Sequence, residues 1–318
     1  MHVFVTGVTG FIGGSVAVRL LEEGHRVAGL VRSPEAVDGL KRLGIEPIPG
    51  TLDDAQVLAR EAAAADAVVN AADSDHRGAV AALIDALAGS GKPLLHTSGS
   101  SIVGGDDRGE ASERVYTEEE MAPGSGWEPA SDKAARVALD RLVLAARERD
   151  VRSVVLCNTL IYGHGRGLAR DSVQIPRLVR QAEASGVVRH VGAGNNIWSN
   201  VHIDDVADLY VRALKAAPAG SFAFVENGEE SFGRLAQAIA DSLGLGAPQP
   251  WDIDAAIAEW GFEPAVYALG SNSRVRGTFA RTELGWRPRH DSAVEWIRAE
   301  VTGLRSSPQA SFGGPAVG

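Results

Sequence analysis

The sequence predicts an α/β fold, in which helices cover a doubly wound parallel sheet and a smaller C-terminal region binds substrate. Short apolar runs typical of buried strands alternate with helical patterns through the first half of the chain. Such alternation implies right-handed crossovers and a mostly parallel sheet, whose ligands bind at the carboxyl ends of the strands. The second observation is a glycine-rich turn between the first strand and the first helix. The third is the length of 318 residues, which is enough for a large core.

The first strand and the turn after it form the clearest pattern. Residues 3–5 predict a buried strand, and glycines follow at positions 7, 10 and 13 where a helix begins. Gly7 permits a tight turn, Gly10 lets the backbone approach a pyrophosphate, and Gly13 lets the helix pack on the strand. The helix N-terminus carries about half a positive charge and unpaired N–H groups. A bare glycine triplet is also typical of a surface turn, so its place before a second strand at residues 26–31 strengthens the prediction.

This turn resembles the nucleotide-binding signature of the short-chain dehydrogenase/reductase superfamily, in particular its extended and atypical branches. The resemblance runs from residue 1 to about residue 300, and implies a Rossmann-type NAD(P)-binding domain over residues 1–165. Residues 166–304 are then a substrate-binding region that returns strands to the core sheet. Residues 305–318 are rich in Ser, Gly and Pro, which predicts a disordered tail. The signature residues expected to bind the cofactor are Gly7, Thr9, Gly10, Phe11, Ile12 and Gly13.

The end of the second strand predicts which dinucleotide binds. NAD enzymes usually place a carboxylate there for the ribose 2′-hydroxyl, but residues 26–34 contain no Asp or Glu. Arg32 and Ser33 occupy this place, and a guanidinium forks onto a 2′-phosphate. We therefore expect NADP(H), with NAD(H) less favoured. The alternative is a solvated arginine in a loop.

Three further segments are expected to touch the cofactor. Leu52 and Asp53 resemble the family's turn over the adenine, although Asp53 or Asp54 equally serves as a cap for a helix at residues 55–63. Small residues after the fourth strand, Ala71 and Ala72, let the backbone face the cofactor. The remaining expected cofactor contacts are Thr97, in the fifth strand, and Lys133.

The fifth strand should deliver a hydroxyl to the substrate carbonyl, as it does in the family. The corresponding position falls on Gly99, which has no side chain. Ser98 and Ser100 flank it, and we prefer Ser100 as the catalytic hydroxyl, with Ser98 facing substrate. Serines beside a glycine are also ordinary turn residues.

The family's catalytic helix places a Tyr four residues before a Lys. Lys133 fits the lysine, whereas the tyrosine position is Pro129, and none of the chain's four tyrosines precedes a lysine at this spacing. Either another group supplies the proton, or the protein catalyses a different reaction, or it catalyses no reaction. Lys133 is expected to hold the nicotinamide ribose or to act as the acid, and a solvated helix lysine is the alternative.

Residues 157–165 resemble the family's Arg-Pro-x-x-x-Tyr-Gly-Pro-Gly, with Cys157-Asn158 in place of Arg-Pro. This places Tyr162 near the substrate as a catalytic candidate and His164 as a substrate contact, although both residue types are often structural. Further along, Trp198 and Asn200 are expected to face substrate, and His202 to be structural. Asp204 or Asp205 should cap a helix at residues 206–216. Arg274 and Arg276 either hold an anionic substrate or are solvated.

Composition limits the partners and the location that we expect for this protein. A net charge of −10 without a basic stripe excludes nucleic acid as an expected partner. No apolar run is long enough to span a membrane, and the first strand starts at residue 2, so we expect no signal peptide and a cytoplasmic protein. No metal is expected, and Cys157 should be buried packing. Residues 104–130 predict a long loop, a lid over the pocket. The expectation of a homodimer comes from analogy with relatives alone.

These features predict an NADP(H)-dependent oxidoreductase, or an epimerase or dehydratase, that acts on a carbonyl or nucleotide-sugar-like small molecule. Hydride would pass between C4 of the nicotinamide and a substrate carbon near Ser100. Because Tyr-x-x-x-Lys is missing, an NADP(H)-binding sensor without redox turnover is the main alternative, and non-redox chemistry in the same pocket is another.

Overall fold

A seven-stranded, entirely parallel sheet forms the centre of the molecule, in the strand order β11-β7-β5-β4-β1-β2-β3. The structure is a computed structural model that describes residues 1–122 and 124–304, with side chains as far as Val301. The order reverses between β1 and β4, which is the switch point where doubly wound sheets bind ligands. The strands of this sheet are β1 (His2–Thr6), β2 (Arg26–Val31), β3 (Glu46–Pro49), β4 (Ala67–Asn70), β5 (Pro93–Gly99), β7 (Arg152–Asn158) and β11 (Ser221–Val225).

Helices cover both faces of this sheet, as the alternation in the sequence predicted. Val3 and Val5 pack into the core beneath one set of helices, whereas Phe4 packs on the opposite face, because side chains alternate along a strand. The first face carries α1 (Phe11–Glu22), α2 (Val37–Arg42) and α8 (Ile203–Ala216). The second face carries α3 (Ala55–Ala64), α4 (Arg77–Leu87) and α6 (Ala134–Ala145).

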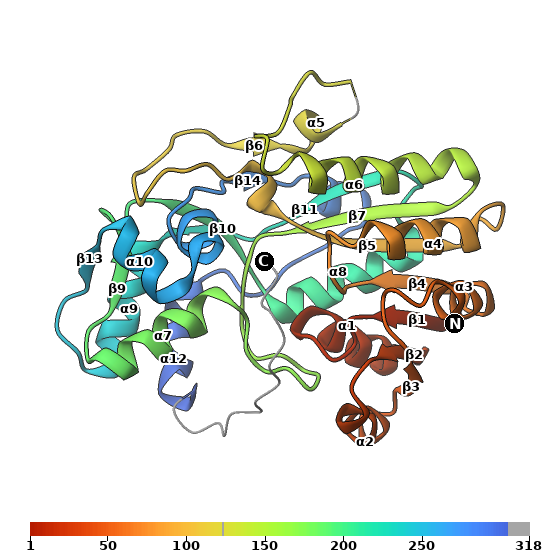
Figure 1. Cartoon of the computed structure of the whole chain (residues 1–318), viewed down its shortest axis with the longest axis horizontal. Coiled ribbons are helices and arrows are strands. Elements are labelled where there is room, and N and C mark those ends of the chain that lie inside the picture. The colour runs from red at the N-terminus through yellow and green to blue at the C-terminus, as the bar shows by residue number, and fades with distance from the viewer. Residues whose placement is uncertain (123, 305–318) are drawn as a thin grey trace.

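The C-terminal elements form a second apolar core beside the sheet, at the left of Figure 1. The helices of this region are α7 (Gln174–Ser185), α9 (Phe232–Leu243), α10 (Ile253–Trp260) and α12 (Ala293–Leu304). Its strands form a sheet of β12 (Glu229–Ser231), β10 (Ile197–His202) and β8 (Leu160–Tyr162), and a pair of β9 (Arg189–Val191) with β13 (Gln249–Trp251). The chain enters and leaves this region more than once, since β11 returns to pair with β7 in the main sheet.

The segment at residues 104–130 contains short elements of its own and is tied to the C-terminal region. It includes β6 (Tyr116–Thr117), which pairs with β14 (Val275–Arg276), and α5 (Glu118–Met121). The Glu118 carboxylate accepts hydrogen bonds from the backbone N–H groups of Phe224, Thr278 and Phe279, where α11 (Phe279–Glu283) begins. A carboxylate at a helix N-terminus is stabilising, so Glu118 fastens this segment to the body of the protein.

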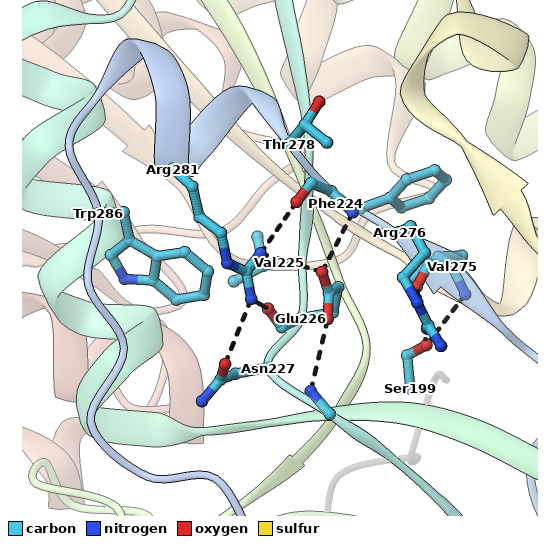
Figure 2. A network of polar contacts seen from close by, with 12 residues as sticks. Ser199, Phe224, Val225, Glu226, Asn227, Val275, Arg276, Thr278, Arg281 and Trp286 are labelled. Atoms are coloured by element: carbon cyan, nitrogen blue, oxygen red, sulfur yellow. Dashed lines mark hydrogen bonds and ion pairs between the residues drawn. The ribbon is translucent and has the colours of Figure 1, made fainter.

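A buried ion pair joins the carboxyl end of β11 to α11. Arg281 Nη1 lies 3.0 Å from Glu226 Oε1, and Arg281 Nη2 donates to the Glu226 carbonyl and to Asn227 Oδ1. Figure 2 shows the Arg281 side chain between these groups and the Trp286 indole, with its guanidinium carbon 5.2 Å from that ring. Only 7% of the Glu226 side chain is exposed, against 32% of Arg281, so the arginine compensates a carboxylate that is largely removed from water.

One expectation about helix caps is wrong, and another holds for the position of the residue but not for its side-chain bond. The helix predicted over residues 206–216 begins at Ile203, and its N-cap is His202, whose Nδ1 accepts from the Asp204 N–H at 3.2 Å. Asp205 instead turns toward the C-terminal segment, where its carboxylate accepts from backbone N–H groups of Arg289 and His290. Asp54 stands at the N-cap of α3 but accepts from the Thr51 N–H, outside the helix.

None of the described helices is both long and apolar enough to cross a bilayer. The predicted tail, residues 305–318, lies outside the described residues. Cys157 is buried in β7, as expected for a packing residue.

Candidate functional site

The glycine turn between β1 and α1 has the shape that a phosphate group needs. Gly7 has a φ of +70°, and a Cβ there would lie 2.3 Å from the Ala71 carbonyl oxygen. A Cβ on Gly13 would lie 2.3 Å from the Gly7 oxygen, whereas on Gly10 it would meet only that oxygen, at 3.2 Å. Gly10 caps α1 without a side chain, so no side chain competes for the first N–H groups of the helix. The open, positively polarised helix end fits the pyrophosphate of a dinucleotide.

The other residues predicted around this turn lie beside it. Thr9, Phe11 and Ile12 are partly exposed at the start of α1. Ala71 and Ala72, which directly follow β4, are also partly exposed and border Gly7. The switch point therefore brings the glycine turn into contact with the small residues that follow β4.

A cavity of about 170 Å³ opens at the carboxyl ends of β2 and β3. Arg32 and Ser33 line it, together with Gly50 and Thr51 from the turn after β3. Arg32 is exposed, and no described carboxylate forms an ion pair with it. The Ser33 hydroxyl donates to the Glu35 carboxylate and lowers the pKa of that group below its usual value.

Leu52 and Asp53 are not part of this cavity's lining. Leu52 is half-buried against the core under the second helical layer, and the exposed Asp53 carboxylate lies 3.2 Å from His76 Nε2. Their predicted contact with the adenine stays a prediction.

The hydroxyl groups of β5 are already engaged inside the protein. Thr97 Oγ1 lies 2.8 Å from the Tyr210 hydroxyl, and Ser98 Oγ donates to Asp140 at 2.7 Å. Ser100 is fully buried, and its hydroxyl lies 2.7 Å from the Ser273 hydroxyl. Ser98 therefore joins β5 to α6, and Ser100 joins the turn after β5 to the segment around Ser273, rather than facing an open pocket.

A row of buried, hydrogen-bonded polar side chains runs across β1, β4 and β5 to α6. Thr6 Oγ1 donates to Asn70 at 2.5 Å, the Asn70 amide contacts His96 Nδ1 at 3.0 Å, and His96 Nε2 lies 3.6 Å from Asp140. Burial lowers the pKa of His96 to about 4, an effect that the nearby Arg136 reinforces. Burial raises the pKa of Asp140 to about 7, against the hydrogen bond from Ser98. Both groups are consequently poised to stay uncharged at mildly acidic pH.

Lys133 is the residue before α6, and its ammonium group is occupied. Nζ lies 3.1 Å from the Asp132 carboxylate and 3.3 Å from the centre of the Tyr267 ring. Tyr267 comes from a π-helical turn over Pro264–Leu269, far along the chain. Burial and the Asp132 carboxylate raise the pKa of this tyrosine. A cation over a phenol ring is a favourable packing contact, so Lys133 joins α6 to the C-terminal region.

Tyr162 is the last residue of β8, and His164 follows it by two positions. Tyr162 is buried, and burial raises the pKa of its hydroxyl, which lowers its capacity as an acid at neutral pH. His164 Nε2 lies 3.2 Å from the Glu300 carboxylate at a half-exposed position. The ring of His202, the N-cap of α8, stacks on that of His290 at 3.8 Å, and His290 Nδ1 lies 2.9 Å from Asp205 Oδ2. His202, Asp204 and His290 bring potential ligand atoms within 4.8 Å of one another, but His202 Nδ1 is used by the helix cap.

Trp198 and Asn200 are buried in β10. The Trp198 indole N–H donates to the Ser271 carbonyl at 2.9 Å, so it supports the turn after the π-helical segment. Asn200 Oδ1 has no hydrogen-bond partner among the described groups. Arg274 and Arg276 share the Glu229 carboxylate at 2.8 and 2.9 Å, so one carboxylate partly compensates two guanidinium groups.

A second cavity, of about 210 Å³, lies between the segment after β5 and the lid segment, residues 104–130. Ile102 and Gly104 form one wall, Trp127 of the lid segment another, and Asn272 and Arg274 the C-terminal side. Its lining includes acidic and basic side chains and two aromatic rings, those of Tyr116 and Trp127. It begins one residue after Ser101, so it adjoins the end of β5.

The sequence analysis missed the residues that join these parts, namely Arg136, Asp75, Ser101, Asp140 and His96. Arg136 and Asp140 follow Lys133 at helical spacing, so the periodicity was visible in the sequence. The partners of these residues on β4 and β5 were not visible, because nothing local specifies such long-range pairs.

The parallel sheet and the glycine turn at its switch point define a dinucleotide-binding α/β protein. Residues 3–223 match the NAD dependent epimerase/dehydratase family, and the chain belongs to that family. It is an NAD(P)-dependent oxidoreductase or epimerase/dehydratase, as the resemblance to extended short-chain dehydrogenases implied.

Relatives agree with this assignment. The chain is 34% identical to Oxidase ucsJ from Acremonium sp, over 90% of this chain and 92% of that protein. It is 31% identical to 2-alkyl-3-oxoalkanoate reductase from Stenotrophomonas maltophilia, over 72% and 71% of the two chains. The crystal structure of dTDP-glucose 4,6-dehydratase from Bacillus anthracis in complex with NAD superimposes with a TM-score of 0.74 over 96% of each chain. Its identity is only 16%, so it shows the shared fold alone.

Proposed function

We propose that this protein is an NADP(H)-dependent oxidoreductase that acts on a carbonyl group of a small molecule. The N-terminus of α1 would hold the pyrophosphate, and the cavity at the ends of β2 and β3 would hold the adenosine part. A bound nicotinamide supplies or accepts hydride at its C4 atom. The substrate would enter from the 210 Å³ cavity beyond β5. The reductase from Stenotrophomonas maltophilia, by its name, acts on a 3-oxo compound, which supports a carbonyl substrate.

Arg32 carries the choice of NADP(H) over NAD(H). Its guanidinium lines the adenosine-side cavity and is exposed, with no ion pair among the described residues to neutralise it. A forked hydrogen bond to a phosphate is one of the stronger polar contacts in proteins, worth about 1.5–3 kcal/mol. A ribose 2′-hydroxyl has no charge to offer in its place.

Replacement of Arg32 with Ala tests this choice by calorimetric titration. NADPH affinity should fall about 10- to 100-fold, and NADH affinity should stay within about twofold, because only NADPH has the 2′-phosphate. Arg42→Ala is the matched control, since Arg42 is an exposed arginine at the end of α2 that does not line the cavity. Equal losses for both dinucleotides, or an unchanged NADPH affinity, would remove Arg32 from this role.

A second candidate function is an NADP(H)-binding sensor without turnover. The engagement of Lys133 with Asp132 and Tyr267 favours it, since the family's lysine is then unavailable. Nicotinamide absorbance followed over a panel of ketones and aldehydes separates the two functions. Tight NADPH binding without consumption on any of them supports the sensor.

A further inference from the structure

Arg177, near the start of α7, has a guanidinium group without a partner. The side chain is partly buried, and its burial, together with the charge of Arg180, lowers its pKa. Within the described residues its guanidinium forms no hydrogen bond, ion pair or aromatic contact. Every other partly buried arginine of the described chain has such a contact, namely Arg19, Arg136, Arg141, Arg152, Arg166, Arg189, Arg212, Arg274 and Arg281.

A partly buried cation without an internal partner is typical of a site whose ligand supplies the opposite charge. Removal of a charge from water is unfavourable unless an opposite charge or hydrogen bonds replace the lost hydration. The planar guanidinium matches a carboxylate, with which it forms two parallel hydrogen bonds. Arg274 and Arg276, which the sequence suggested for an anionic substrate, already share the Glu229 carboxylate. Arg177 is therefore the better placed arginine for a ligand carboxylate.

The segment that leads into α7 runs along the edge of the proposed dinucleotide site. The Arg166 N–H donates to Ser15 Oγ of α1 at 3.1 Å. A Cβ built on Gly14 of α1 would lie 3.1 Å from the Gly167 Cα. The segment thus rests on the start of α1, the helix whose N-terminus is proposed to bind the pyrophosphate, and it leads on to α7.

At the start of α7 the chain contacts the π-helical turn that carries Tyr267. The Gln174 side-chain amide donates to the Ala268 carbonyl at 3.5 Å, and the neighbouring Tyr267 ring lies over Lys133 Nζ. Arg177 follows Gln174 by three positions on the same face of the helix, and side chains of a helix lean toward its N-terminus. Arg177 is thereby placed beside the junction of α7, the π-helical turn and the start of α6.

Exposed apolar side chains border the same junction. The described residues include three exposed large apolar side chains, those of Met1, Val173 and Phe262. Val173 directly precedes α7, and the Phe262 ring packs edge-on against the Tyr267 ring, at 5.5 Å between centroids. Exposed apolar surface beside an unpaired cation suits a ligand that has both a carboxylate and an apolar chain.

We propose that Arg177 binds a carboxylate of the substrate, and that the substrate is an oxo acid with an apolar chain. This inference rests on the proposed carbonyl oxidoreductase function and names its substrate class. The apolar chain would pack against Val173 and Phe262. The cavity beyond β5 includes Ala130 in its lining, and the Ala130 carbonyl accepts from the Lys133 N–H, so this cavity also reaches the start of α6.

Calorimetry of dead-end complexes tests the proposal without any turnover. Protein saturated with NADP⁺, which cannot reduce a carbonyl, is titrated with pyruvate, 2-oxooctanoate and benzoylformate, and with the methyl ester of each. One or more of the acids should bind at least about tenfold tighter than its ester, because the ester has no charge for Arg177. Arg177→Met should weaken binding of that acid about 10- to 100-fold and change binding of its ester less than about twofold.

Two further measurements separate ligand binding from a structural role. Arg180→Met is the matched control, since Arg180 lies one turn further along α7, is exposed and pairs with Asp171 at 3.4 Å. This variant should bind the acid within about threefold of wild type, because an exposed charge acts weakly at a distance. Arg177→Met should unfold at the urea concentration of wild type or above it, since Arg177 has no internal partner to lose. A clearly lower midpoint, with equal losses for acid and ester, would show a structural arginine and overturn the proposal.

The outcomes separate this inference from the function on which it rests. Acids that bind no tighter than their esters, or that keep their affinity in Arg177→Met, would overturn it, while reduction of any ketone by wild type would leave the oxidoreductase standing. Tighter binding of dihydroxyacetone phosphate than of every oxo acid would assign Arg177 to a phosphate and overturn the substrate class. NADPH binding without reduction of any carbonyl would overturn the oxidoreductase, and the dead-end titrations would still decide the role of Arg177.

Discussion

The buried pair of His96 and Asp140 gives an unusual dependence of stability on pH. The pKa of Asp140 rises from 3.8 to about 7 on folding, because both carboxyl oxygens are buried. Its protonated form is therefore favoured in the folded state. The stability from this group is complete below about pH 4 and is lost as the pH rises to about 7, which amounts to about 4 kcal/mol.

His96 acts in the opposite direction. Its pKa falls from 6.5 to about 4 on folding, so the unfolded chain binds a proton that the folded one excludes. Its contribution is complete above about pH 6.5 and is lost as the pH falls to about 4, by about 3 kcal/mol. Between about pH 4 and pH 7 the changes in stability from His96 and Asp140 cancel to within about 1 kcal/mol in wild type. Removal of either group should reveal the pH dependence of stability that the other group causes.

Urea unfolding of wild type and Asp140→Asn from pH 4 to 8, followed by circular dichroism, measures this directly. The variant should gain about 4 kcal/mol over wild type between pH 4 and 7, because it loses the cost of the buried carboxylate. His96→Asn should instead lose about 3 kcal/mol relative to wild type between pH 4 and 6.5, because it lacks the opposing slope of His96. Asp85→Asn, at an exposed carboxylate, is the control and should show no such trend. A difference between Asp140→Asn and wild type that does not change with pH would refute the reasoning.

Other parts of the structure give further predictions. Gly13→Ala places a methyl group 2.3 Å from the Gly7 oxygen, which should cost about 1–3 kcal/mol of stability and abolish measurable NADPH binding by calorimetry. Arg281→Met leaves the Glu226 carboxylate buried without its partner and should lower the free energy of unfolding by about 3–5 kcal/mol. The added change Glu226→Gln should restore part of that loss in the same urea titration, and a further loss would contradict the ion-pair explanation.

The alternation of strands and helices and the spacing of the glycines were sufficient to predict the parallel sheet and the glycine turn between β1 and α1. These features are local, since a strand end, a positive φ and a helix start lie within a few residues of one another. Val3 and Val5 on one face and Phe4 on the other follow from the period of a strand.

The partners of the polar side chains were not predictable in the same way. Ser100 was preferred as the catalytic hydroxyl, yet its partner Ser273 lies 173 residues away in sequence. The sequence placed Lys133 at the start of a helix, but it did not predict the Tyr267 ring that covers the ammonium group. Such pairs depend on how the C-terminal region packs against the sheet, which no local pattern specifies.

The proposed function requires that the N-terminus of α1 binds the pyrophosphate of a nicotinamide dinucleotide. Calorimetric titration of the wild-type protein with NADPH and with NADH is the most direct measurement. We predict binding of one NADPH per chain, at least about tenfold tighter than NADH, as a forked contact from Arg32 to the 2′-phosphate requires. If neither dinucleotide binds, the proposed pyrophosphate site at α1 is wrong, and so is every assignment that depends on it.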